Sequence, residues 1–296
     1  MEELTFCPLC KYDHFEVFLP VEDHFLSHEQ FKIDQCQHCG FLFTNPRPAE
    51  NHLSDYYISE NYISHSGIKK GLINKIYLFA RSYRLVWKFN LIARLKTGRS
   101  ILDIGCGTGE LLNYFKLHQW ETAGIEPNDR ARAFALSSYG LDVKDKFAIA
   151  QFNTASFDVV TLWHVLEHVK DLDTRLQQIN RILKDDGYLI IAVPNVNSFD
   201  AKSYGAFWAA YDVPRHLYHF TRKTMNWLLN QNGFTVHTVL PMCLDTYYIC
   251  ILSEKYKTGE SSFLKGLLHG AQSNVHAWFG DREYSSLIYI VKKNNK

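Results

Sequence analysis

The stretch RSILDIGCGTGELLNYFKLHQW, Arg99 to Trp120, determines how the rest of this sequence is interpreted. It predicts a buried strand over Ser100 to Ile104, a glycine-rich turn, and an amphipathic helix over Glu110 to His118. The glycines of the turn are Gly105, Gly107 and Gly109. Such a turn lets a ligand approach the backbone closely, and the helix N-terminus offers amide donors to it. The stretch therefore predicts an α/β fold with a ligand site at this turn.

Asp103 distinguishes between the ligands that such a turn could hold. Its carboxylate lies two positions before Gly105, where it would repel a pyrophosphate but suit a ligand that carries an ammonium group. The glycine spacing is GxGxG, whereas the dinucleotide-binding fingerprint is GxGxxG. S-adenosylmethionine (SAM) has an ammonium group, a carboxylate and a ribose, and no phosphate. We therefore expect SAM as the cofactor; a strand-to-helix turn without a ligand is the alternative.

A second strand is predicted over Glu121 to Ile125, and it ends in Glu126. An acid at this position can accept hydrogen bonds from the hydroxyl groups of a ribose. Glu126 therefore predicts a ligand that contains a nucleoside. It does not distinguish SAM from a dinucleotide, because both carry ribose.

The segment FDVVTLWHVLEHV predicts another buried strand, Asp158 to Leu162, followed directly by Trp163 and His164. Residues at the carboxyl end of such a strand face the ligand crevice of an open α/β sheet. We expect Trp163 or His164 to contact the cofactor, since an aromatic face attracts a sulfonium ion. Glu167 and His168 are expected to begin the next helix.

Two CxxC pairs near the N-terminus predict a structural zinc site. They are CPLC at Cys7 and Cys10, and CQHCG at Cys36 and Cys39. Two such pairs supply the four thiolates that tetrahedral zinc prefers, and a site with four protein ligands is closed to substrate. The alternative is four reduced cysteines without metal.

Four segments over residues 98–196 resemble the successive motifs of the class I SAM-dependent methyltransferases: LDIGCGTG, the acid Glu126, FDVVTLWHVLEHV and RILKDDGYLIIAVPN. The CxxC pairs, FTNPRP and YYISENY also resemble a bacterial subgroup in which a zinc-binding segment precedes this domain. The resemblance implies an α/β, Rossmann-like seven-stranded sheet with helices on both faces. It also implies three parts: a zinc ribbon (1–50), a helical cap or linker (51–97), and the methyltransferase domain (98–296) with an acceptor-side insertion at about 195–222.

By the same resemblance, the methionine end of SAM would lie on the glycine-rich turn, its ribose near Glu126, and its adenine beside the following two residues. The residues so assigned are Asp103, Gly105, Cys106, Gly107, Gly109, Glu126, Pro127 and Asn128. The chain departs from the family at Lys184 to Gly187, where KDDG replaces the usual LKPGG. We expect this difference to alter only a surface turn.

Some relatives with a similar ExxEH pattern bind a divalent metal at those positions. This chain reads HxxEH there, so a second metal held by His164, Glu167, His168 and His219 is conceivable. Mixed histidine and carboxylate groups also serve as helix caps and core hydrogen-bonding groups, and that alternative stays open.

The segment between residues 195 and 222 is long and rich in aromatic residues, which favours an insertion that covers the acceptor. Within it, His216 is our first choice for a general base, because histidine is the side chain best suited to that role at neutral pH. Asp212 would orient His216 or act as the base itself, and Arg215 would anchor an anionic acceptor. His164 is the third catalytic candidate. Alternatively, Asp212 and Arg215 pair to close the loop, and His216 only fills a hydrogen-bonding position.

The composition gives weaker evidence about function than the motifs do. The 296 residues carry a net charge of +1, which gives no whole-chain attraction to nucleic acid or an anionic membrane. The opening MEELTFCPLC lacks secretory-signal features and no apolar run is long enough for a membrane span, so we expect a cytoplasmic protein. The apolar YYICILS would pack in the core or in a homodimer interface.

We therefore expect a SAM-dependent methyltransferase of a small molecule, with a sugar or polysaccharide precursor as the first choice of acceptor. An enzyme that acts on RNA or protein is the alternative, because LIARLKTGR and IVKKNNK are basic, although they lack the aromatic platforms that bind RNA. A third hypothesis is a module that binds the cofactor without catalysis.

Overall fold

The computed structural model describes residues 1–57, 84–95, 97–260 and 262–294. The long helix that the sequence predicts from Ile68 to Leu95, and much of the predicted cap over 51–97, lie largely outside these residues. Of that helix, residues 84–93 are described and are helical.

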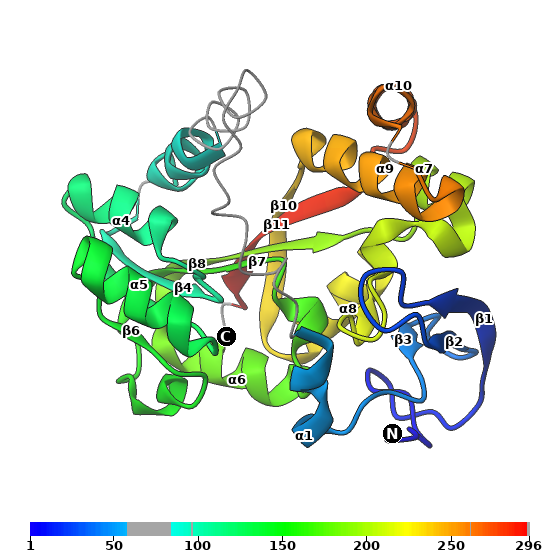
Figure 1. The fold of residues 1–296 in the computed structure, drawn as a ribbon. Helices are drawn as coiled ribbons and strands as arrows, with labels where there is room; N and C mark the ends of the chain where they lie inside the picture. Colours follow the sequence, from blue (N-terminus) through cyan, green and yellow to red (C-terminus); the bar gives the residue numbers. More distant parts are fainter. Residues whose placement is uncertain (58–83, 96, 261, 295–296) are drawn as a thin grey trace.

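A seven-stranded sheet forms the centre of the larger part of the molecule (Figure 1). Its strands, in spatial order, are β10 (Phe234–Pro241), β11 (Ser286–Lys293), β8 (Leu183–Pro194), β7 (Phe157–Trp163), β4 (Ser100–Ile104), β5 (Glu121–Ile125) and β6 (Val143–Lys144). Neighbours from β8 to β6 run parallel, whereas β11 is antiparallel to both β8 and β10. This arrangement confirms the predicted Rossmann-like seven-stranded fold.

Helices cover both faces of this sheet because its central strands are apolar on both sides. The helices of this part are α4 (Glu110–Leu117), α5 (Asp129–Tyr139), α6 (Leu172–Ile182), α7 (Phe199–Tyr204), α8 (Arg222–Gln231), α9 (Cys243–Thr258) and α10 (Phe263–Phe279). Leu102 and Val160 share a buried cluster with residues of α6 and α8. Their neighbours Ile101 and Val159 point the other way, into a cluster with α4 and the helix of residues 84–93.

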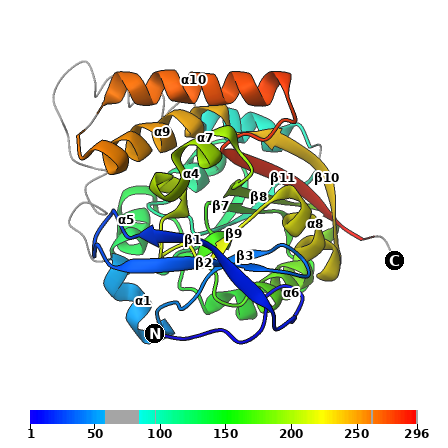
Figure 2. The ribbon, with the colours of Figure 1, turned by 90° about the vertical axis from the view of Figure 1, so that its right-hand side faces the viewer.

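A second sheet has four strands, three of which come from the N-terminal part of the chain (Figure 2). It consists of β1 (Phe15–Glu22), β2 (Gln30–Cys36), β3 (Leu42–Thr44) and β9 (Tyr218–His219). The first three strands are those of the predicted zinc ribbon. The fourth strand, β9, comes from the segment that the sequence identifies as an acceptor-side insertion, so the ribbon and this segment share one sheet.

One expectation for local structure is wrong. Glu167 and His168 do not begin a helix but lie in a 3-10 turn, Leu166–His168. Helix α6 starts later, at Leu172, because the Asp171 side chain accepts a hydrogen bond from the backbone of Thr174 and caps it. The KDDG segment lies within the bounds of β8, where the register shifts: Phe157 pairs with Leu183 and Val159 with Tyr188, so residues 184–187 bulge out of the ladder and Asp185 and Asp186 are exposed.

The apolar stretch YYICILS lies in α9, where Ile249, Cys250 and Ser253 are buried. Helix α9 packs against α10, and the two form an antiparallel pair at one side of the molecule (Figure 2). Across the described parts of the chain, no helix combines the length and the apolar character needed to cross a lipid bilayer.

Candidate functional site

The seven-stranded sheet has a topological switch point beside β4. From β4 the chain crosses to β5 on one side, and it later returns to β7 on the other side. A crevice forms outside the carboxyl ends of strands at such a point, because the connections on the two sides lead in opposite directions. The glycine-rich turn after β4 and the residues after β7 therefore meet at the same edge of the sheet.

The glycine-rich turn depends on the absence of side chains. Gly105, Gly107 and Gly109 have φ values of +73°, +54° and +78°, a left-handed backbone conformation that favours glycine. A Cβ atom on Gly105 would lie 2.4 Å from Cγ2 of Val165, so the turn packs closely against the segment after β7. A Cβ atom on Gly107 would meet no atom within 4 Å. Gly107 thus borders open space, as expected where a ligand approaches the backbone.

Asp103 lies at the base of this turn and is only 4% exposed. Thr161 on the neighbouring strand donates a hydrogen bond of 2.5 Å to its Oδ1. Burial removes water from the carboxylate and raises the pKa of Asp103 to about 6. A buried carboxylate of this kind favours a cationic ligand group, which fits the ammonium group of SAM.

Lys88, on the helix of residues 84–93, faces the same place, and the sequence interpretation missed it. Its Nζ lies 3.9 Å from the centroid of the Trp163 ring, and its charge interacts with Asp103. Burial lowers the pKa of Lys88 to about 8, although Asp103 opposes that shift. The only signal in the sequence is spacing: Lys88 precedes the buried Ile92 by one helical turn, which puts the lysine on the inner face. A cation thus already occupies the position over Trp163 where a sulfonium was expected.

Glu126 follows β5 and is 9% exposed. Its Oε2 accepts a hydrogen bond of 2.9 Å from the amide of Gly107, and its Oε1 accepts one of 2.9 Å from the amide of Asn128. Glu126 therefore fixes the turn itself, and each oxygen retains a second lone pair for a ligand hydroxyl. Asn128 caps α5 by accepting a bond from Ala131.

At the end of β7, the backbone of His164 is left-handed, with φ of +56°. Its Nδ1 lies 3.4 Å from Glu167 Oε1, and its Nε2 lies 3.5 Å from Asp245 Oδ2. Burial alone would lower the pKa of His164, but the carboxylates of Asp245 and Glu167 outweigh burial and raise it. His164 therefore serves as a charge partner to two acids at the edge of the crevice.

Glu167 lies beyond His164 and is fully buried. Neither of its carboxylate oxygens accepts a hydrogen bond from the described residues. Burial alone would raise the pKa of Glu167, but His164 and the neighbouring His216 and His168 outweigh burial and lower it. Glu167 is thus an anion at neutral pH that relies on the surrounding imidazole rings.

His216 and His168 each place Nδ1 beside a backbone carbonyl oxygen. Nδ1 of His216 lies 2.8 Å from the carbonyl oxygen of Ala210, and Nδ1 of His168 lies 2.9 Å from that of Arg215. A neutral His216 that donates from Nδ1 to the carbonyl of Ala210 carries its lone pair on Nε2. Nδ1 of His168 lies close to a second group as well, the hydroxyl of Tyr57, at 2.9 Å. His216 Nε2 lies 4.0 Å from Glu167 Oε1 and 3.9 Å from Asp212 Oδ2.

Glu167, His168 and His216 each offer one ligand atom, and these atoms lie within 4.8 Å of one another. They could hold a divalent cation. The set conceived from the sequence differs, since it included His164 and His219 and left out His216. His219 lies elsewhere in the loop, with its Nε2 3.1 Å from Oγ1 of Thr44.

Arg215 does not face the crevice. It is 3% exposed, and its Nη2 donates hydrogen bonds of 2.7 Å to both Asp23 and Asp212. Asp23 belongs to the connection after β1, so this pair of bonds ties the loop to the zinc ribbon. The sequence allowed two roles for Asp212 and Arg215: a part in catalysis, or an ion pair that closes the loop. The structure contains that ion pair.

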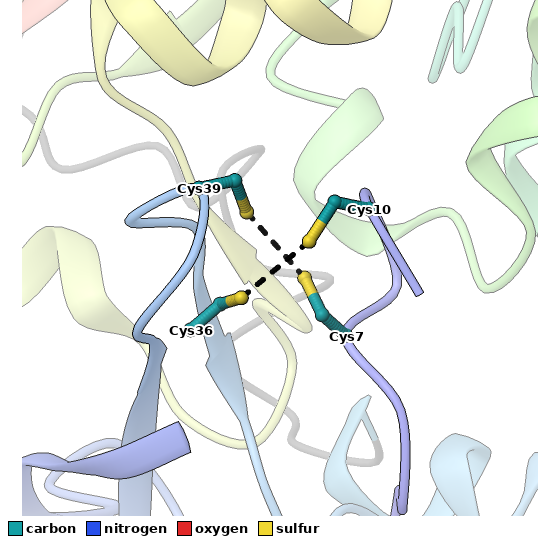
Figure 3. Close-up of side chains that lie close together, drawn as sticks. All are labelled: Cys7, Cys10, Cys36 and Cys39. Carbon is teal, nitrogen blue, oxygen red and sulfur yellow. Dashed lines mark hydrogen bonds between the residues drawn. The ribbon is translucent and has the colours of Figure 1, made fainter. Parts of the chain in front are cut away.

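The four cysteines of the two CxxC pairs point at one centre (Figure 3). Their sulfur atoms lie within 4.8 Å of one another, with Cys7 to Cys39 at 3.6 Å and Cys10 to Cys36 at 3.5 Å. A tetrahedron with zinc–sulfur bonds of about 2.3 Å has edges of roughly 3.8 Å, so these separations suit zinc. All four thiols are free.

Both cysteine knuckles use the same backbone geometry, which explains how the chain forms the site. Lys11 and Gly40 each lie four residues after the first cysteine of their pair, with φ of +62° and +78°. The amide of Lys11 donates to the carbonyl of Cys7 at 3.0 Å, and that of Gly40 to the carbonyl of Cys36 at 2.9 Å. The two turns therefore present their thiols in the same way.

Comparison with known proteins places this geometry in a family. The family model described as a methyltransferase domain matches residues 78–239, more than half of the chain. The human mitochondrial ubiquinone biosynthesis O-methyltransferase is 29% identical over 167 residues, or 51% of this chain and 45% of the relative. The ubiquinone biosynthesis O-methyltransferase of Paracidovorax citrulli is 29% identical over 135 residues, or 42% of this chain and 57% of the relative. The chain spans about half the length of the curated relatives it matches.

Solved structures agree on the fold. A SAM-dependent methyltransferase from Thermotoga maritima is 18% identical with a TM-score of 0.53, and the match covers 82% of this chain and 100% of that one. The geranyl diphosphate C-methyltransferase of Streptomyces coelicolor A3(2) is 13% identical with a TM-score of 0.50, covering 72% of this chain and 76% of that one. At these identities the likeness concerns the fold alone.

Proposed function

This chain belongs to the family of methyltransferase domains, and on that premise we propose that it transfers a methyl group from SAM to a hydroxyl oxygen of a small molecule. The observation that carries the proposal is the placement of His216, whose Nδ1 lies 2.8 Å from the carbonyl oxygen of Ala210 and whose Nε2 lies 4.0 Å from the buried Glu167. A sugar or polysaccharide precursor is our first choice of acceptor. The names of the relatives, which are O-methyltransferases, support an oxygen acceptor.

The residues around the glycine-rich turn would hold the cofactor. Asp103 would accept the ammonium group, the open space over Gly107 would receive the methionine end, and Glu126 would accept the ribose hydroxyls. When bound, SAM supplies a methyl group on a sulfonium, which a nucleophile can displace in line. Lys88 must give up its place over Trp163 or pair with the methionine carboxylate.

His216 would act as the general base. Its Nε2 would accept the proton of the acceptor hydroxyl, while the hydrogen bond from Nδ1 to the carbonyl of Ala210 keeps the ring in the required orientation. Glu167 and Asp212 lie within 4.0 Å and would balance the positive charge that the ring gains. Arg215 is engaged by Asp23 and Asp212 and so would position the loop without touching the acceptor.

The test uses purified protein, SAM with an isotopically labelled methyl group, and two sources of acceptor: a panel of nucleotide-linked sugars and a cell extract of small molecules. We expect a labelled small-molecule product. His216→Ala should lower turnover by about 100-fold or more, the typical contribution of a general base, and should leave the affinity for SAM unchanged. The exposed His237 on β10 provides the control, since His237→Ala should have no effect.

Other outcomes would assign other roles. Unchanged turnover in His216→Ala would contradict the general base. Activity that is lost on chelation and restored by a divalent cation, with His168→Ala as damaging as His216→Ala, would make His216 a metal ligand. Label in RNA or protein would favour the macromolecular alternative, and tight SAM binding without any transfer would favour a non-catalytic module.

We also propose the division of the chain that the sequence suggested: a ribbon over 1–50, a cap over 51–97, and a methyltransferase domain with an insertion at about 195–222. The pairing of β3 with β9 supports treating the ribbon and the insertion as one acceptor-side unit. A cytoplasmic location is part of the same proposal.

A further inference from the structure

Helix α10 packs on its neighbour through a stripe of small residues. Gly266, Gly270, Ser273 and Ala277 are its buried residues, and they face α9 and α7. A Cβ atom on Gly266 would lie 2.6 Å from Cα of Ile251, and one on Gly270 would lie 2.8 Å from Cδ1 of Tyr247. The inner face of α10 is therefore fully used by close backbone packing, and the large side chains of the helix must point elsewhere.

The large apolar side chains of α10 point outward. Figure 2 shows the helix at the outer edge of the molecule, beyond α9 and α7. Six of these side chains are between 56% and 83% exposed: Phe263, Leu264, Leu268, Val275, Trp278 and Phe279. This helix is thus inverted relative to an ordinary surface helix, which buries its large apolar residues and exposes polar ones.

The spacing of the outer residues is that of a helix that pairs with another helix. Leu264, Leu268, Ala271, Val275 and Trp278 follow one another at alternating intervals of four and three residues. This alternation is the apolar seam of a coiled coil, in which side chains of one helix insert between those of the facing helix. The seam is nearly symmetric about Ala271, whose small side chain would allow two helices to approach closely.

We propose that α10 is the interface between two copies of this chain, packed antiparallel across a two-fold axis at Ala271. In this arrangement Leu264 of one copy faces Trp278 of the other, and Leu268 faces Val275. Each contact occurs twice, as two-fold symmetry requires. The proposal concerns assembly and does not rest on the proposed reaction.

The exposed area suits a second copy. Phe263, Trp278 and Phe279 are aromatic, and a buried aromatic side chain contributes about 150–250 Å². Phe263 and Phe279 flank the seam, and together with Leu264, Leu268, Val275 and Trp278 they form the apolar surface that a second copy would cover. An exposed apolar patch of this size is uncommon on a monomer.

The charges also favour an antiparallel second copy over a lipid surface. Lys265 lies in the first turn of α10, His276 lies in its last turn, and Asp281 and Arg282 follow the helix. In an antiparallel pair, each Lys265 would lie beside the C-terminal end of the partner helix, whose last carbonyl groups favour a cation. A helix that lies in an anionic membrane surface carries many lysines or arginines, whereas α10 has one lysine and no arginine.

Analytical ultracentrifugation of the full-length protein tests the proposal. We expect the wild type to sediment at twice the monomer mass of 34.4 kDa, and Leu268→Glu to sediment as a monomer. Gln272→Glu provides the matched control, because Gln272 is exposed on the polar side of the same helix and its change should leave the dimer intact. Thermal unfolding of each variant shows whether the fold is retained.

Cysteine cross-linking tests the register. Ala271→Cys should form a disulfide with its own copy under mild oxidation, because the two-fold axis brings the two positions together. Leu264→Cys should not, since the two positions would lie about 21 Å apart along the helices, far beyond the roughly 4–7 Å between Cα atoms that a disulfide allows. A wild type that stays monomeric at high concentration, or that binds vesicles of anionic phospholipid through Leu268, would overturn the proposal.

Discussion

The buried Asp103 and the half-buried Lys88 carry charges that interact, and the ligand-free protein stabilises both charges poorly. The pKa of Asp103 is raised to about 6 and that of Lys88 is lowered to about 8, so both shifts favour the neutral forms. Burial is the first cause in each case, and the attraction between the two charges does not compensate for the lost water. Such a pair is expected where a site is organised for a ligand rather than for stability.

The pair therefore predicts that Asp103→Asn/Lys88→Met is more stable than the wild type. The raised pKa of Asp103 makes its contribution to stability fall as the pH rises from about 4 to 6. The lowered pKa of Lys88 makes its contribution rise between about 8 and 10.5. Between pH 6 and 8, both charged groups therefore lower the free energy of unfolding by their full amounts. In that window the variant should be more stable by at least about 1 kcal/mol, which raises the melting temperature by a few degrees.

The same variant should lose SAM binding, because it lacks the carboxylate that accepts the ammonium group. Asp158→Asn on β7 provides a control whose expected effect on the melting temperature is opposite. Ser100 and Lys184 outweigh burial and lower the pKa of Asp158, so its loss should lower the melting temperature. A double variant that melts below the wild type at pH 7 would contradict the account of the pair.

At the scale of elements, the zinc ribbon and the proposed acceptor loop are coupled through one sheet. Leu42 pairs with His219 and Phe43 with Tyr218, although these residues are far apart in the sequence. Thr44 adds two contacts: its amide donates to the carbonyl of Leu217 at 3.0 Å, and its hydroxyl donates to that of His216 at 2.7 Å. The backbone of the proposed base thus depends on strand β3, which follows directly after Cys36 and Cys39.

Removal of zinc should therefore loosen the acceptor loop. We expect about one zinc per chain in the wild type, little in Cys36→Ser, and faster amide hydrogen exchange over residues 211–220 in the variant. Cys243→Ser, on α9 and away from the cluster, should change neither. Elemental analysis and exchange mass spectrometry measure both effects. A zinc-free wild type, or exchange over 211–220 that is unchanged in a zinc-free variant, would contradict the coupling.

The elements that the sequence predicts well are those with local signals. Strands Ser100–Ile104 and Glu121–Ile125 have the predicted bounds, because each is a short segment that ends at a clear signal, a glycine turn in the first case and an acid in the second. Strand β9 was not predicted, because its two residues are ordered by a partner strand in the ribbon. Lys88 was missed for a similar reason, since only the tertiary packing brings its amine to Asp103 and Trp163.

At the scale of the whole molecule, two halves of the candidate site meet at one edge of the seven-stranded sheet. The turn after β4 and Glu126 after β5 form the half that is expected to hold the cofactor. Residues after β7 and the loop that carries His216 form the other half, and the zinc ribbon supports this loop from outside. The sequence could locate the first half from its motifs. The second half was only a set of candidates, because the order of residues in a loop does not fix their geometry.

The central claim is that this chain is a SAM-dependent enzyme, and selective ligand stabilisation tests it most directly. The melting temperature of the purified protein is measured with SAM, with its demethylated product S-adenosylhomocysteine, and with NAD at equal concentrations. A ligand at 100 times its dissociation constant adds roughly 2.7 kcal/mol of stability, so SAM and its product should raise the melting temperature by several degrees while NAD leaves it unchanged. Equal shifts with NAD, or no shift with SAM, would contradict the claim.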